Sequence, residues 1–177
     1  MNKITILLIE DNPSDVRLIK ELLKEIDNFS YNLLTSGTIK EGCDQIRNNK
    51  LDLILLDLNL PDSMGHQTFN AVLGCSSDIP IILISGVEDE ELSLNLIKEG
   101  AQDYITKQRL SNSLLDKVIL YSIERKKAER ALKKKSDDLE NLNSYFVDRE
   151  LKMVELKKEV NELLKRLGEK GKYNIVG

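Results

Sequence analysis

Three nearly continuous apolar runs dominate the first half of this 177-residue chain. They occupy residues 4–9 (ITILLI), 51–56 (LDLILL) and 79–84 (IPIILI). Runs of this length and composition are typical of strands that are buried on both faces of a parallel sheet. Two weaker strands are predicted at residues 31–35 (YNLLT) and 103–106 (DYIT).

Amphipathic stretches separate these strands. Apolar residues recur there at helical spacing, in the groups Val16, Ile19, Leu22, Leu23 and Ile26, then Ile39, Cys43 and Ile46, then Leu92, Leu96 and Ile97. We expect Ser14, after Pro13, to cap the first helix and Gly100 to end the helix before the last strand. Alternation of strand and helix predicts an α/β fold, a doubly wound five-stranded parallel sheet.

A heptad pattern covers the last third of the chain, where residues 114–167 contain neither Gly nor Pro. The first series is Val118, Arg125, Leu132, Leu139, Phe146, Met153, Val160 and Leu167, and the second is Tyr121, Ala128, Lys135, Leu142, Arg149, Leu156 and Leu163. We call these two series the seam. The pattern predicts a long C-terminal α-helix that forms a coiled coil. We expect a parallel homodimer through residues 118–167, and a helical hairpin is the alternative.

These patterns predict three parts: a sheet domain at 1–123, a coiled-coil helix at 124–168 that continues its last helix, and a flexible tail at 169–177. The sheet domain is acidic, with 19 Asp or Glu against 11 Lys or Arg, which argues against nucleic-acid binding there. No apolar run reaches 18 residues, so we expect no membrane insertion and a cytoplasmic protein. Cys43 and Cys75 are expected to be free thiols.

Polar residues follow the predicted strands. Glu10 and Asp11 end the first strand, Asp57 the third, Ser85 the fourth and Lys107 the fifth. The carboxyl ends of parallel strands share one edge of the sheet, where such folds place their sites. Three carboxylates at that edge favour Mg²⁺, while a lysine and a hydroxyl suit a phosphoryl group. Asp57 lies in the middle of the edge, where its carboxylate can attack phosphorus.

Four segments, ILLIEDNPSD, LILLDLNLPDSMG, IILISG and GAQDYITK, together resemble the receiver domains of two-component response regulators, over about residues 3–125. The resemblance implies a flavodoxin-like fold with strand order 2-1-3-4-5. It also implies a phosphorelay in which Asp57 accepts a phosphoryl group from a histidine kinase or phosphotransfer protein.

The same resemblance implies roles for the neighbouring residues. Asp11 and Asp57 would bind Mg²⁺ by their side chains, Asn59 by its backbone carbonyl and Glu10 through water. Ser85 and Lys107 would contact the phosphoryl group, and Tyr104 matches the aromatic switch position. Two departures are Gln108, where many receivers have Pro after the lysine, and Ser85 in place of Thr.

The helical region also resembles known modules. The run YSIERKKAERAL is similar to the junctions that join receivers to sensor and kinase modules, and residues 146–169 are similar to a helical segment of sensor histidine kinases with PAS domains.

Three functions compete on this sequence. The favoured one is a phosphoacceptor, not an enzyme, that signals through a dimeric coiled coil. The first alternative is a phosphorylation-independent scaffold for protein binding. The second is a magnesium-dependent phosphatase, which needs a general acid two residues after Asp57, where this chain has Asn59. We expect His66 to be a surface residue at the start of a helix, and DNA binding is disfavoured because no helix-turn-helix follows residue 125.

Overall fold

A computed structural model describes residues 3–76, 78–86 and 89–174 of the chain. The chain forms two compact units, residues 1–128 and 129–177. Within the described residues, no helix combines the length and the apolar character that crossing a membrane requires.

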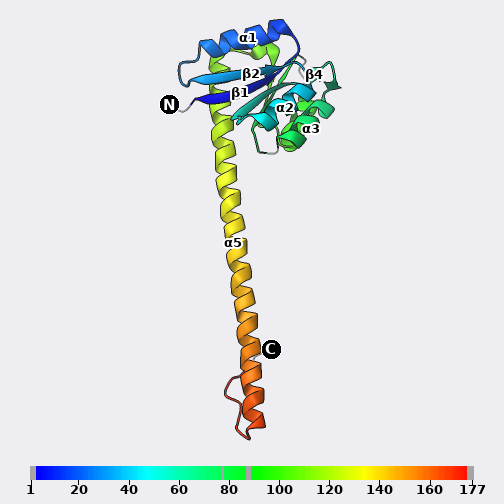
Figure 1. The fold of residues 1–177 in the computed structure, drawn as a ribbon. Helices are drawn as coiled ribbons and strands as arrows, with labels where there is room; N and C mark the ends of the chain where they lie inside the picture. The colour runs from blue at the N-terminus through cyan, green and yellow to red at the C-terminus, as the bar shows by residue number, and fades with distance from the viewer. Residues whose placement is uncertain (1–2, 77, 87–88, 175–177) are drawn as a thin grey trace. The chain divides into compact units, whose positions relative to one another are not determined.

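The first unit is built on a five-stranded parallel sheet (Figure 1). Its strands are β1 (Ile4–Ile9), β2 (Tyr31–Ser36), β3 (Leu53–Asp57), β6 (Ile81–Ser85) and β7 (Asp103–Thr106). Their order is β2-β1-β3-β6-β7, which confirms the predicted doubly wound topology. The third and fourth predicted strands begin two residues later than expected, and Pro80, which has no N–H to donate, lies directly before β6.

Four helices connect these strands: α1 (Pro13–Lys24), α2 (Ile39–Asn48), α3 (His66–Cys75) and α4 (Glu90–Lys98). The predicted cap at Ser14 is wrong. Asn12 is the N-cap of α1, and its side-chain oxygen accepts a hydrogen bond from the Ser14 N–H at 2.9 Å. Pro13 takes the first helical position, where its missing N–H costs nothing. Gly100 follows α4 with a φ of 119°, as the predicted helix end requires.

Two apolar layers enclose the sheet, because successive residues of a strand point to opposite faces. Ile6 and Leu8 belong to one layer and Leu7 and Ile9 to the other, all four fully buried. Helix α2 lies so close to β1 that a Cβ at Gly42 would come within 2.6 Å of the Ile9 side chain. The apolar runs are therefore strands covered on both sides.

The expectation of two free thiols is wrong, because Cys43 of α2 and Cys75 of α3 form a disulfide. These residues are 32 positions apart in the sequence, but the packing of α2 beside α3 brings their Cα atoms to 5.7 Å. That separation lies within the range that a disulfide spans. The sequence spacing carries no sign of this contact, which depends on how the two helices pack.

A small hairpin that the sequence did not predict follows β3. Strands β4 (Asn59–Leu60) and β5 (Ser63–Met64) pair antiparallel. Gly65 closes the hairpin with a φ of 55°, and its N–H donates to the Leu58 carbonyl at 2.7 Å. This hairpin fixes the chain immediately after Asp57.

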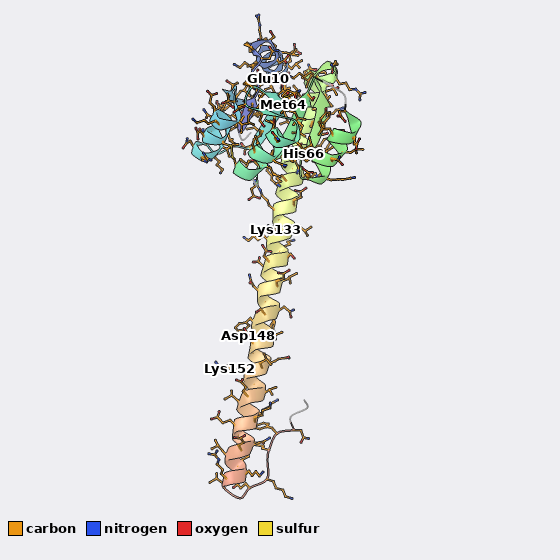
Figure 2. All side chains as sticks on the ribbon, turned by 90° about the vertical axis from the view of Figure 1, so that its right-hand side faces the viewer. Glu10, Met64, His66, Lys133, Asp148 and Lys152 are labelled. Atoms are coloured by element: carbon orange, nitrogen blue, oxygen red, sulfur yellow. A yellow bond between two sulfur atoms is a disulfide. The ribbon has the colours of Figure 1, made fainter. Side chains whose placement is uncertain are left out.

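Helix α5 (Asn112–Arg166) is one continuous helix of 55 residues, which excludes the helical hairpin. Its first turns bury Leu115, Val118, Ile119 and Ile123 in the first unit. From Glu129 onward most of its side chains are exposed, among them Lys133, Asp148 and Lys152 (Figure 2).

The chain after α5 makes hydrogen bonds back to the helix. Asn161 accepts hydrogen bonds from the N–H groups of Lys172 and Tyr173 at 2.9 and 3.0 Å, and its amide donates to the Tyr173 carbonyl at 2.8 Å. The tail therefore returns along the helix as far as Tyr173. Residues 175–177 of the expected tail lie outside the described residues.

Candidate functional site

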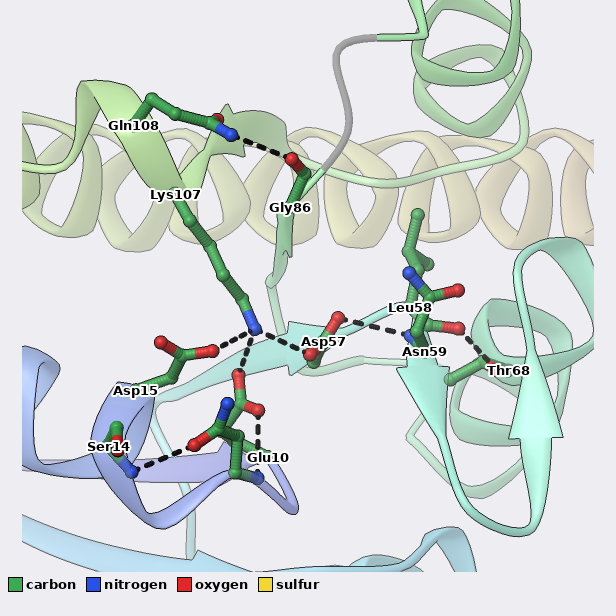
Figure 3. Close-up of polar contacts among 11 residues, drawn as sticks. Glu10, Ser14, Asp15, Asp57, Leu58, Asn59, Thr68, Gly86, Lys107 and Gln108 are labelled. Carbon is green, nitrogen blue, oxygen red and sulfur yellow. Dashed lines mark hydrogen bonds and ion pairs between the residues drawn. The ribbon is translucent and has the colours of Figure 1, made fainter.

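The carboxyl ends of β1, β3 and β7 bring charged side chains together at one edge of the sheet (Figure 3). Asp57 is the last residue of β3, Glu10 directly follows β1, and Lys107 directly follows β7. Glu10 and Asp57 are 3% and 4% exposed. Carboxylates are rarely buried this far without a partner, so the site must neutralise them.

Lys107 supplies that partner. Its Nζ lies 2.7 Å from Asp57 Oδ2, 2.8 Å from Glu10 Oε2 and 2.6 Å from Asp15 Oδ2. Asp15 was not among the predicted site residues. In sequence it is an acid in the first turn of a helix, where acids commonly offset the helix dipole. Its position in the sequence does not distinguish it from other such acids.

The second oxygen of Asp57 is also held. Asp57 Oδ1 accepts a hydrogen bond from the backbone N–H of Asn59 at 3.0 Å. The intervening Leu58 carbonyl accepts from the Thr68 hydroxyl at 2.9 Å, which ties this turn to α3. Asp57 thus has both oxygens in fixed contacts.

Glu10, Asp11 and Asp57 form a cluster of oxygen ligands. Each offers a carboxylate oxygen, and these oxygens all lie within 4.8 Å of one another. Glu10 Oε1 accepts from the Asn12 N–H at 3.1 Å, whereas Oε2 makes no hydrogen bond beyond its ion pair with Lys107 within the part of the chain that the structure describes. An all-oxygen set with an under-satisfied buried oxygen fits a hard divalent cation.

The charges shift two pKa values in this cluster. Burial raises the pKa of Glu10 from 4.5 to about 7, against the opposing effect of Lys107 and with a further rise from the Asp57 charge. Burial lowers the pKa of Lys107, but its contacts with Asp15, Asp57 and Glu10 outweigh that effect and raise the pKa above its ordinary value. The pKa shifts therefore favour the charged form of Lys107 and the neutral form of Glu10.

The remaining predicted residues lie around this cluster. Ser85 is the last residue of β6, next to β3 in the sheet, and is 4% exposed. Tyr104 lies half-buried on β7 and packs against the apolar layer that contains Leu83. Gln108, which directly follows Lys107, donates from Nε2 to the Gly86 carbonyl at 2.8 Å and so links the segments after β7 and β6.

His66 lies outside the cluster. It begins α3, as predicted, and its Nε2 is 3.1 Å from Glu99 Oε1 at the end of α4. Its side chain is 42% exposed, and this contact is between helix ends. The structure thus gives His66 a surface position, and its contact is with Glu99 and not with the carboxylate cluster.

Comparison with known proteins agrees with this geometry. The cell cycle transcriptional regulator CtrA of Caulobacter vibrioides is 29% identical over 143 residues, which are 81% of this chain and 61% of that protein. The chain thus spans less than two thirds of that relative's length. A response regulator receiver domain from Clostridium thermocellum is 27% identical, with a TM-score of 0.61 over 71% of this chain and 98% of that one.

A further solved structure has the same fold. It is the receiver domain of a sensor histidine kinase from Pseudomonas aeruginosa, described with a magnesium ion coordinated in its active-site cleft. It is 22% identical, with a TM-score of 0.59 over 70% of this chain and 99% of that one. The family model for the response regulator receiver domain matches residues 6–119 of this chain. The chain therefore belongs to the response regulator receiver family.

Proposed function

We propose that this chain is a phosphoacceptor that takes a phosphoryl group on Asp57 from a histidine kinase or phosphotransfer protein. The observation that carries the proposal is the buried Asp57 carboxylate, held by Lys107 at 2.7 Å beside the carboxylates of Glu10 and Asp11. A buried acid that already has a cation and a neighbouring oxygen cluster is prepared for a ligand that brings both a metal and further negative charge.

The chemistry follows from the groups around Asp57. A carboxylate oxygen of Asp57 attacks phosphorus, the bond between phosphorus and the donor's histidine nitrogen breaks, and the imidazole leaves with that electron pair. Lys107 faces the same oxygens and stabilises the negative charge of the transferring group. The Asn59 N–H orients the carboxylate during the attack.

Magnesium is the cation that we infer for the site. Asp11 and Asp57 would bind it by their side chains, with Glu10 acting through water and Asn59 through its carbonyl. When bound, it would neutralise the carboxylates and the phosphoryl oxygens. The under-satisfied Glu10 Oε2 and the oxygen-only donor set support this choice. Ser85 and Tyr104 are proposed to respond to the phosphoryl group. Ser85 lies on β6, beside β3, and Tyr104 lies on β7, one strand further.

The part of the seam within residues 129–167 is exposed, and this supports a dimeric output. Large apolar residues of this helix remain in solvent, including Leu132 at 71% and Leu139 at 67% exposure. A row of such residues at heptad spacing is expected to pair with another helix. We therefore propose that the signal passes through a homodimer of α5.

Incubation with acetyl phosphate and Mg²⁺, followed by intact-mass measurement, tests the phosphoacceptor. The wild-type chain should gain one phosphoryl group, and Asp57→Asn should gain none. Asp27→Asn, which removes an exposed carboxylate away from the site, should behave as wild type. Equal labelling of the Asp57→Asn variant would contradict the assignment of Asp57 as the phosphoacceptor. No labelling of the wild-type chain would favour the phosphorylation-independent scaffold.

A further inference from the structure

The seam of the second unit is exposed, although the returning tail covers another side of the helix. Phe146, Met153 and Leu156 of the seam are 50–53% exposed. Asn161, which holds the tail, is not a seam residue, and the half-buried residues near it also lie off the seam. The tail therefore leaves the seam open to a second copy of this chain.

The charges in and beside the seam argue against the expected parallel pair. In a parallel pair in register, a residue directly before a seam residue faces the partner residue five positions further along the chain. Lys152, directly before Met153, therefore meets Lys157 of the partner subunit. Lys135 and Arg149 would each face their own copy inside the seam. Along residues 129–167 this arrangement creates no flanking pair of opposite charge to offset these repulsions.

An antiparallel pair centred on Ser144 reverses this balance. A seam residue then faces the partner residue for which the two residue numbers add up to 288. A residue that flanks the seam faces the flanking partner residue for which the two numbers add up to 286 or 290. Glu129 meets Lys157 of the partner subunit, and Asp138 meets Lys152 of the partner subunit. By symmetry each attraction occurs twice.

The same alignment also resolves the charges inside the seam. Leu132 packs on Leu156 of the partner subunit, and Leu142 packs on Phe146 of the partner subunit. Arg149 faces Leu139 of the partner subunit and Lys135 faces Met153 of the partner subunit, so no two cations share a layer. Their aliphatic stems can cover the apolar partner while the charged ends reach water.

Sliding one helix along the other changes which charged residues meet. A one-heptad slip brings Glu129 to Glu150 of the partner subunit in one direction and Asp138 to Glu159 of the partner subunit in the other. A slip of three heptads toward the C-terminus again matches charges, but it leaves Leu132 and Leu139 uncovered. The alignment centred on Ser144 is the one that matches charges and covers the exposed apolar residues.

We infer that α5 pairs with a second copy in antiparallel order, with Ser144 at the two-fold axis. This inference rests on the proposed dimerisation and adds its orientation. The Glu129 residues of the two copies are then 30 positions apart along the paired helices, about 45 Å at about 1.5 Å per residue. This order is opposite to the parallel one expected for the coiled coil.

Thiol cross-linking of the full chain tests the orientation. The described chain has no free cysteine, so Leu132→Cys and Leu156→Cys each add a single reactive thiol. The two variants are co-expressed with different tags and treated with a short bismaleimide without reductant. A cross-linked heterodimer is expected, with little product from either variant alone. Cross-linking of each variant to itself, or no heterodimer product, would overturn the inference.

Charge reversal gives a second test. Lys152→Asp should weaken the dimer about tenfold, since it places Asp against Asp138 of the partner subunit. Adding Asp138→Lys should restore the affinity to within about threefold. In a parallel dimer, Lys152→Asp would instead strengthen the pair through Lys157 of the partner subunit. Lys158→Asp makes the same charge change off the seam and should have little effect.

Sedimentation tests dimerisation separately from the orientation of the two helices. A monomeric wild-type chain would contradict dimerisation itself, and with it any orientation. A dimer that cross-links in the parallel pattern would contradict only the antiparallel inference and leave the proposed dimer intact.

Discussion

The Nζ of Lys107 lies 2.7 Å from Asp57 Oδ2 and joins that carboxylate to those of Glu10 and Asp15. One cation thus holds three acids, two of them nearly fully buried. The arrangement makes the metal-free fold dependent on Lys107 and makes the site receptive to a second cation.

Replacing Lys107 by Met should therefore destabilise the protein in EDTA at neutral pH. We expect the free energy of unfolding to fall by about 2–4 kcal/mol, because the buried carboxylates lose their partner. Saturating Mg²⁺ should restore part of this loss. Urea unfolding measures both values, and the exposed Lys98→Met should change stability by less than about 0.5 kcal/mol. An unchanged unfolding midpoint in EDTA would show that the ion pairs do not support the fold.

Glu10 should make the metal-free protein less stable as the pH rises. Its pKa is about 7 in the folded chain against 4.5 for an ordinary glutamate, so the folded state binds the proton more tightly. The stabilisation is fully present below pH 4.5 and is lost as the pH rises through 7. The loss is on the order of 1–3 kcal/mol.

Glu10→Gln tests this dependence in EDTA. The variant should be more stable than wild type at pH 8 and should show a flatter stability profile between pH 4.5 and 7. Glu155→Gln, a change at an exposed helix position, should keep the wild-type profile. If Glu10→Gln keeps the wild-type slope as well, another group controls the pH dependence.

The disulfide should contribute measurably to stability. The Cys43–Cys75 bond closes a segment with a sequence separation of 32, and loops of this size gain roughly 2–4 kcal/mol from such a link. A thiol reductant should lower the unfolding temperature of the wild-type chain to that of the Cys43→Ala/Cys75→Ala variant. The double variant should not respond to reductant. Alkylation of both cysteines in the oxidised, folded protein would contradict the bond.

Much of the fold was predictable because the strands of a parallel sheet are marked by their own composition. The residues that follow those strands, Glu10, Asp57 and Lys107, were assigned to one edge by topology alone, and the structure brings them into contact. Local periodicity was also enough to predict α5 as a helix.

The features that were missed depend on packing between distant segments. Asp15 reaches Lys107, 92 residues away, only because α1 begins beside the end of β7. Cys43 and Cys75 meet only because α2 and α3 are neighbours. The parallel order expected for α5 took no account of the flanking charges, which distinguish the two orders. Apolar pattern predicts which residues are buried, and it carries less information about which partner each one meets.

Localisation of the phosphoryl group tests the central proposal most directly. The wild-type chain is phosphorylated with acetyl phosphate and Mg²⁺, and borohydride reduction then converts the acyl phosphate into an alcohol that survives peptide mass mapping. Asp57 alone should become homoserine, and omission of Mg²⁺ should abolish the product. Reduction at Glu10, Asp11 or Asp15 in place of Asp57, or no reduced residue in a chain that binds Mg²⁺, would contradict the assignment of Asp57 as the phosphoacceptor.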